Sequence, residues 1–62
     1  METNYLLRLV LANETRMMIA SPAKTRGDVS GQAIGLMETL GAKDVEIWNA
    51  HTHELVMEIE SK

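Results

Sequence analysis

The two histidines of the chain stand two residues apart, at His51 and His53, and Glu54 follows them. Imidazole and carboxylate groups bind zinc, but most zinc sites take three or four ligands from the protein. The chain has no cysteine and no further histidine. His51 and His53 are therefore weak candidates for a metal shared across a dimer interface. We expect instead a solvated hairpin tip, with no metal and no cofactor.

Lys24 and Arg26 flank the expected start of a helix. The free N–H groups of a helix N-terminus attract phosphate or sulfate, and two neighbouring cations would strengthen that attraction. These two residues form a weak anion-binding candidate. Solubilising charge beside a helix cap is the simpler explanation of the same pattern.

Other patterns that accompany catalysis are missing from the sequence. Ser21, Ser30 and Ser61 lie far along the chain from either histidine, so no nucleophile–base pair is indicated. The chain contains neither a phosphate-binding loop nor a dinucleotide-binding fingerprint. The nine acidic residues are spread as solvated strand and helix faces would require. We expect no catalytic residue and no enzymatic activity.

The length and the charge of the chain limit its partners. A chain of 62 residues is expected to bury only about 60% of its unfolded surface, so its stability should be marginal. No disulfide can add to that stability, and oligomerisation is the remaining route. The net charge of −3 argues against general nucleic-acid binding, which requires an excess of lysine and arginine.

We expect a cytoplasmic protein that does not enter a membrane. The N-terminal segment METNYLLRLVLAN has no basic leader, and Arg8 interrupts its apolar run. That run is too short for a secretory signal or a membrane span. The size of the chain and its lack of a catalytic set fit an accessory protein of a bacterium or a bacteriophage.

The spacing of the apolar residues predicts an α+β domain over residues 1–62 with the element order ββαββ. The predicted strands cover 5–11, 15–20, 44–49 and 55–60, and the predicted helix covers 26–40. Thr25 is expected to cap the helix, with Asp28 completing a variant of the capping box. A start after Ser21, with Pro22 in the first helical position, remains open.

One side of the predicted sheet and one stripe of the predicted helix should form the core. A three-residue loop at 12–14, in which Asn13 is able to adopt a left-handed conformation, aligns the first two strands, whereas a two-residue loop would bury Arg16. The 50–54 connection is expected to keep the last two strands in matching register. The inward strand residues are then Tyr5, Leu7, Leu9, Leu11, Met17, Ile19, Val45, Ile47, Asn49, Leu55, Met57 and Ile59. The helix contributes Val29, Ala33, Leu36, Met37 and Leu40, and ends at Gly41.

The crossover through the helix makes the second and third strands parallel to each other. The simplest arrangement then places the first and fourth strands side by side, which gives the strand order 2-1-4-3. In length and element order the chain resembles the β-grasp of the small bacterial immunoglobulin-binding domains, over nearly its whole length. This resemblance implies nothing about a ligand. The plain order 1-2-3-4 and an intertwined dimer remain alternatives.

Gly27, Gly31 and Gly35 form a line along the predicted helix, opposite its apolar stripe. Each interior glycine costs roughly 0.5–1 kcal/mol relative to alanine. The simpler explanation is a surface that was never optimised for stability. The alternative is a smooth groove onto which a partner docks, with Ile34 as an apolar contact.

The sheet face away from the helix is predicted to be the main interaction surface. Trp48 is the only tryptophan, and tryptophan is enriched in interface hot spots, although a half-exposed tryptophan that covers neighbouring strands is an alternative. With the first and fourth strands adjacent, Arg8 should lie near Glu58. The predicted contact residues are Trp48, Met18, Leu6, Val10 and Val56 on the sheet, with Gly31, Ile34 and Gly35 on the helix.

These features predict a non-enzymatic interaction or regulatory module. The expected partner is a second copy of the chain, in a homodimer formed through the uncovered sheet face, or another protein. The alternative is a small-ligand binder, which would use Lys24 and Arg26 for an anion or His51 and His53 for a bridging metal.

Overall fold

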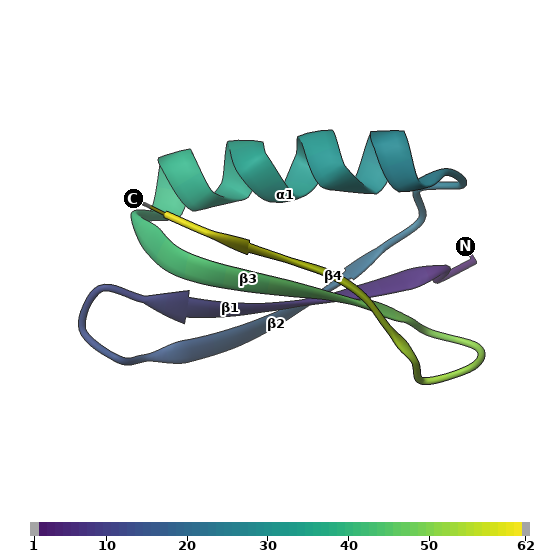
Figure 1. Cartoon of the computed structure of the whole chain (residues 1–62), viewed down its shortest axis with the longest axis horizontal. Coiled ribbons are helices and arrows are strands. Elements are labelled where there is room, and N and C mark those ends of the chain that lie inside the picture. The colour runs from purple at the N-terminus through teal and green to yellow at the C-terminus, as the bar shows by residue number, and fades with distance from the viewer. Residues whose placement is uncertain (1, 62) are drawn as a thin grey trace.

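The computed structural model describes residues 2–61 and shows one four-stranded sheet with a helix across one of its faces (Figure 1). The elements are β1 (Tyr5–Leu11), β2 (Arg16–Ser21), α1 (Arg26–Leu40), β3 (Ala42–Asn49) and β4 (Leu55–Glu60). The α+β class and the ββαββ order are as predicted. Within the described residues, no helix is both long and apolar enough to cross a membrane.

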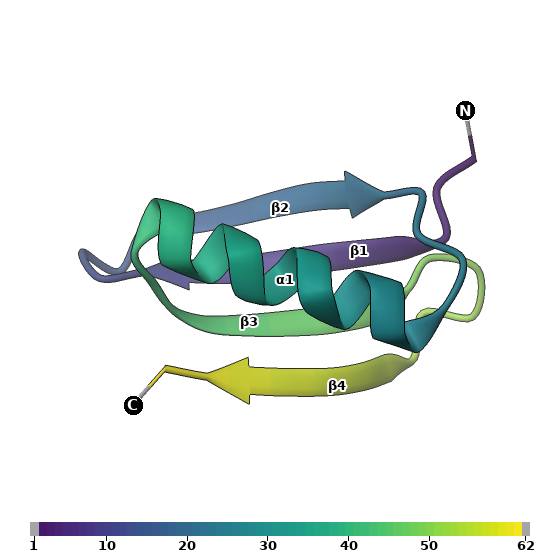
Figure 2. The ribbon, with the colours of Figure 1, turned by 90° about the horizontal axis from the view of Figure 1, so that it is seen from above.

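The strand order is β2-β1-β3-β4, and every neighbouring pair is antiparallel (Figure 2). The predicted order 2-1-4-3, which the β-grasp resemblance shares, is therefore wrong. Val45 and Ile47 of β3 are completely buried, whereas Met57 and Ile59 of β4 are only partly buried. Placing β3 beside β1 buries these two side chains at the centre and leaves the glutamate-bearing β4 at an edge. It also avoids a parallel pair, which is slightly less stable per residue.

The first hairpin has the predicted three-residue loop. The N–H of Leu11 donates to the carbonyl of Thr15 at 2.8 Å, which closes the loop across residues 12–14. Met17 and Ile19 consequently lie opposite two buried leucines of β1, on the side that faces the helix. The register therefore keeps Arg16 out of the core, as predicted.

The left-handed residue in this loop is Glu14, with a φ of 70°, and not Asn13, the residue that the sequence suggested for that conformation. The side-chain Oδ1 of Asn13 accepts the N–H of Thr15 at 3.0 Å, so this residue stabilises the turn through its side chain instead. Lys43 Nζ donates a hydrogen bond to Glu14 Oε1. This hydrogen bond and the charge of Lys43 lower the pKa of Glu14.

The helix begins and ends with the predicted caps. Thr25 Oγ1 accepts the N–H of Asp28 at 3.1 Å, and Gly41 is left-handed, with a φ of 68°. The N–H of Gly41 donates to the carbonyl of Met37, which satisfies one of the free carbonyls at the helix end. Leu40, in the last turn, is 38% exposed and lies outside the core, contrary to prediction.

The second hairpin keeps the predicted register from Val45–Ile59 to Ile47–Met57 and loses it at the loop end. Ile47 pairs with Met57, but Trp48 pairs with Leu55, so Val56 has no partner and forms a β-bulge. An extra residue on one strand reverses the sides of the residues beyond it. Leu55 therefore lies opposite Trp48 and is 49% exposed, whereas Val56 packs against the core. Leu55 was predicted to face the core and Val56 to face away from it, and both predictions were wrong.

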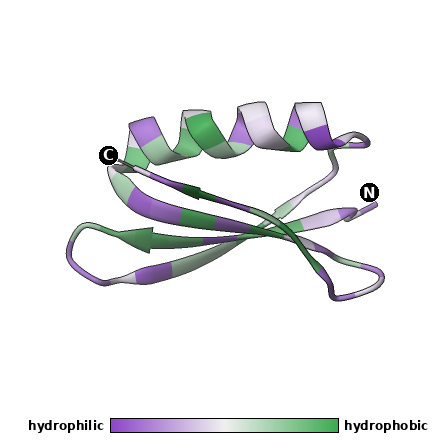
Figure 3. Cartoon of the chain, in the orientation of Figure 1, coloured by the Kyte–Doolittle hydropathy of each residue, from purple (hydrophilic) through white to green (hydrophobic). Residues whose placement is uncertain are grey.

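The core lies between the helix and the sheet, where hydrophobic and hydrophilic positions alternate along β3 and β4 (Figure 3). Its buried hydrophobic residues are Leu7, Leu9, Val29, Ala33, Met37, Ala42, Val45 and Ile47. Ser21 is the buried polar residue of the described chain. Its hydroxyl donates to Gln32 Oε1 and accepts the N–H of Ala23 at 3.2 Å, which fastens the end of β2 to the helix.

Candidate interaction surface on the open sheet face

The helix α1 covers one face of the sheet and leaves the other uncovered (Figure 1). We call the uncovered face the open face, and alternate side chains of all four strands lie on it. The strand register arranges these side chains in three rows, each running from β2 to β4. The apolar row consists of Ala20, Leu6, Trp48 and Leu55. The middle row consists of Met18, Arg8, Glu46 and Glu58. The outer row consists of Arg16, Val10, Asp44 and Glu60.

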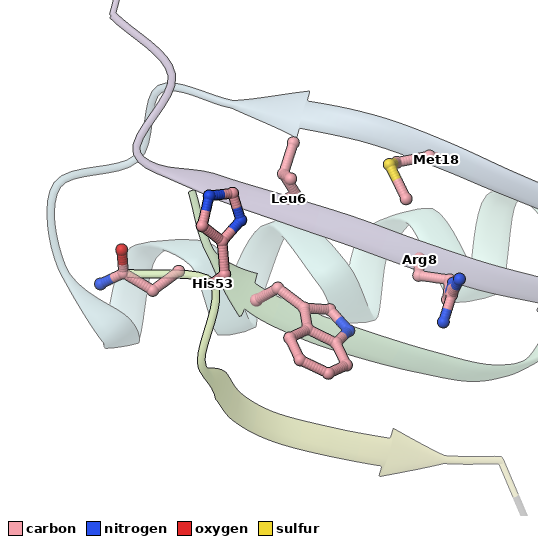
Figure 4. Close-up of a pocket in the computed structure, with 6 residues that line it drawn as sticks. Leu6, Arg8, Met18 and His53 are labelled. Atoms are coloured by element: carbon pink, nitrogen blue, oxygen red, sulfur yellow. The ribbon is translucent and has the colours of Figure 1, made fainter. Parts of the chain in front are cut away.

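The apolar row lies at the end of the sheet next to the β3–β4 loop. Trp48 is partly buried between Leu6 and Leu55, its partners on the two neighbouring strands. Met18 in the adjoining row is 60% exposed. A shallow hollow of about 280 Å³ opens here, lined by Leu6, Arg8, Met18, Trp48, Asn49 and His53 (Figure 4). The open face thus presents a contiguous apolar patch of the kind that marks interaction sites.

Opposite charges occupy opposite halves of the open face. The β2–β1 half carries Arg16 and Arg8, and the β3–β4 half carries four carboxylates, from Asp44, Glu46, Glu58 and Glu60. Arg8 Nη1 lies 3.6 Å from Glu46 Oε1. The predicted proximity of Arg8 and Glu58 was wrong, because β3 and not β4 is the neighbour of β1. Exposed ion pairs of this kind contribute little stability.

The acidic half brings carboxylates together that the sequence leaves far apart. Oxygen atoms of Asp44, Glu58 and Glu60 lie within 4.8 Å of one another, a spacing that can hold a divalent cation. A hydrogen bond shared with Asp44, the charge of Asp44, partial desolvation and the charges of Glu60 and Glu46 raise the pKa of Glu58. Asp44 Oδ1 is buried and has no hydrogen-bond partner among residues 2–61.

The two histidines point to different neighbours. His51 Nε2 lies 3.2 Å from Asn4 Oδ1, whereas His53 borders the hollow on the open face (Figure 4). His53 is also left-handed, with a φ of 62°, which turns the backbone back into β4. Neither histidine belongs to a group of three or more potential metal ligands among residues 2–61. The geometry therefore gives no support to a metal held by this pair.

Lys24 and Arg26 are exposed at the helix N-terminus, as the sequence indicated. However, the N–H of Asp28 is already taken by the Thr25 side chain, and the carboxylate of Asp28 lies in the first turn. That negative charge occupies the position at which a helix N-terminus favours an anion. The local electrostatics therefore do not favour a second anion here.

The glycine line lies on the outer side of the helix. A Cβ atom added at Gly31 or Gly35 would meet nothing within 4 Å, and Ile34 between them is 44% exposed. The helix that carries these residues lies on the other side of the sheet from the open face (Figure 1). The helix and sheet residues proposed from the sequence as contacts therefore form two separate surfaces, and Val56 belongs to neither of them.

Sequence patterns located most of the open face but missed three of its features. Leu55 was assigned to the core, Ala20 was not singled out, and the acidic cluster was taken for scattered charge. Only the position of Leu55 depends on the bulge at Val56, which no local pattern encodes. Alternation along β2 already places Ala20 on the open face, and the predicted pairing of the last two strands already brings the three carboxylates together. No family model, curated protein or solved structure matches the chain.

Proposed function

We propose that this protein is a non-enzymatic interaction module that associates with a second copy of itself through the open face. The observation that carries the proposal is the apolar row, with Met18 beside it, on a face that no element of residues 2–61 covers. Contiguous apolar patches on a sheet face rimmed by charge are typical of protein interfaces. The proposed contact residues are Trp48, Leu6, Leu55, Met18 and Val10.

The small core supports the same proposal. A chain of 62 residues has only eight buried hydrophobic residues in its core among those described, and two of them are alanines. Small domains of this kind gain stability when they oligomerise, because a second sheet removes further apolar surface from water. Two sheets packed face to face form a stable two-layer arrangement about 10 Å apart.

Trp48→Ala tests the proposal most simply. The substitution should leave a folded chain, because Trp48 lies outside the buried core, and should raise the dissociation constant of the dimer by about tenfold or more. Sedimentation velocity over a dilution series measures the dissociation constant, and far-ultraviolet circular dichroism checks the fold. Unchanged association in a folded variant would refute the proposed surface.

Met17 and Met18 provide a matched pair of controls. They are adjacent methionines on the same edge strand, both exposed, and they point to opposite faces of the sheet. Met18→Ala should weaken association, and Met17→Ala should not. Equal losses from both would indicate that two β2 strands pair edge to edge, because such a contact uses both sides of the strand.

The proposed setting is the cytoplasm, where such a dimer would leave the outer sides of both helices free. The glycine line and Ile34 would then be available to a further protein partner. Association that is lost in Ile34→Ala and kept in Trp48→Ala would reverse this assignment. It would make the helix surface, and not the open face, the site of self-association.

A further inference from the structure

We propose that the two copies pack open face to open face with their two-fold axis nearly parallel to the strands, between β1 and β3. This inference rests on the self-association proposed above and specifies its geometry. The resulting dimer places β2 of each copy over β4 of the other, and β1 over β3. Each row of the open face then lies over the same row of the second copy, in the reverse order.

This arrangement places each row over itself in reverse order. It sets Met18 over Glu58 and Val10 over Asp44 of the second copy, and the remaining contacts are complementary. In the outer row, Arg16 lies over Glu60 of the second copy. In the middle row, Arg8 lies over Glu46 of the second copy. In the apolar row, Leu6 lies over Trp48 of the second copy. Because a two-fold axis repeats every contact, the face supplies four opposite-charge contacts and a continuous apolar strip.

A two-fold axis perpendicular to the strands instead brings like charges together. Centred on the middle row, it places Arg8 over Arg8 and Glu46 over Glu46 of the second copy. It also places the apolar row over the outer row, so that Trp48 lies over Asp44. Stacked sheets cross at about −30°, and both axes satisfy that geometry equally well. The charge pattern therefore selects the axis parallel to the strands.

A third arrangement overlaps only the apolar rows and leaves both charged rows outside the contact. It buries fewer side chains, since the middle and outer rows stay in water. It also predicts that charges at the far end of the face have no effect on association. Substitutions in the outer row therefore distinguish it from the full overlap.

Arg16 and Glu60 make a decisive pair, because they stand on opposite edges of the sheet within one chain. β1 and β3 separate their strands, which places them roughly 14 Å apart at the usual spacing between strands. Among residues 2–61, no ion pair joins these two side chains within one copy. Arg16→Glu and Glu60→Arg should each raise the dissociation constant about tenfold, because each brings like charges together.

The double variant R16E/E60R should restore the affinity of the original chain, since each new charge again faces its opposite on the second copy. Lys24→Glu, an equal change of charge at an exposed site away from the open face, is the control and should have little effect. Sedimentation velocity in the presence of EDTA compares all five proteins. EDTA removes any cation bridging the acidic cluster.

The results of these measurements distinguish a wrong orientation of the two copies from a wrong contact surface. A double variant as weak as the two single variants would overturn the parallel axis, while Trp48→Ala would still report whether the open face is used. Single variants that associate like the original chain would overturn the full overlap in the same way. An original chain that stays monomeric at every concentration would overturn the proposed self-association itself, and the orientation with it.

Discussion

The same four strands build two sheet faces that differ in how their side chains are arranged. On the face covered by the helix, apolar residues occur in every row, and Leu7, Leu9, Val45 and Ile47 are completely buried. On the open face, one row is apolar and two are charged, with arginines in one half and carboxylates in the other. Alternation within a strand determines which residues share a face. Register between strands determines their neighbours, and only register gives the open face its pattern.

Leu7 and Leu6 test the difference between the faces most strongly, because they are adjacent on β1 and point to opposite sides. Leu7→Ala should lower the free energy of unfolding by about 2–5 kcal/mol, since it removes a completely buried side chain and leaves a cavity. Leu6→Ala should cost much less, because Leu6 is only partly buried. Urea unfolding followed by circular dichroism at high dilution measures both. Equal losses would show that the two faces contribute alike to the fold of the monomer.

Ser21 tests the attachment of the covered face to the helix. Ser21→Ala should lower the free energy of unfolding by about 1–3 kcal/mol, because it leaves the Gln32 carbonyl and the Ala23 N–H without their buried partner. Ser30→Ala is the matched control, on the helix, and should be neutral or slightly stabilising, since alanine has the higher helix propensity. A neutral Ser21→Ala would mean that water replaces both hydrogen bonds.

Gly31 and Gly35 test whether the outer helix surface serves only as a cover. Gly31→Ala and Gly35→Ala should each raise the free energy of unfolding by about 0.5–1 kcal/mol, because the added methyl group meets open space and restricts the unfolded chain. The dissociation constant of the dimer should not change. A weaker dimer in either variant would place the contact on the glycine line and break the contrast with the open face.

Glu58→Gln tests the acidic half of the open face and should have the smallest effect. A raised pKa means that the folded chain binds a proton more tightly than the unfolded chain, so this carboxylate opposes folding at neutral pH. The opposition should disappear as the pH falls through the raised pKa towards the ordinary value of 4.5.

Thermal unfolding followed over a range of pH measures this effect. Glu58→Gln should unfold at a higher temperature than the original chain near neutral pH, and the two curves should converge in acid. A Glu58→Gln chain that is less stable at neutral pH would contradict the crowding of carboxylates seen in the structure.

The sequence predicted the features of the fold that depend on local chemistry. The Thr25 cap, the Gly41 stop and the three-residue loop before β2 are set by residues within a few positions of one another. The strand order could not be predicted in the same way. Both orders keep two hairpins and one crossover, and the choice depends on how β3 and β4 compete for the place beside β1.

For single residues of the open face, too, the sequence predicted what depends on local chemistry and missed what depends on the pairing of strands. Trp48, Leu6 and Met18 were placed there correctly, since alternation alone fixes their side of the sheet. Leu55 and Val56 exchanged places because of a bulge that no local pattern in the second hairpin indicates. The pairing of Arg8 with Glu46 likewise depends on β1 and β3 being neighbours, so it could not be predicted without the strand order.

Trp48 is the only tryptophan of the chain, so its fluorescence reports on the open face without labelling. The most direct measurement follows Trp48 emission and the light-scattering mass together while the original chain is diluted. If the open face is the dimer contact, the mass should fall from two chains to one as the emission shifts to longer wavelength, with a common midpoint. A monomer at every concentration, or a change of mass without a change in Trp48 emission, would contradict the proposed contact.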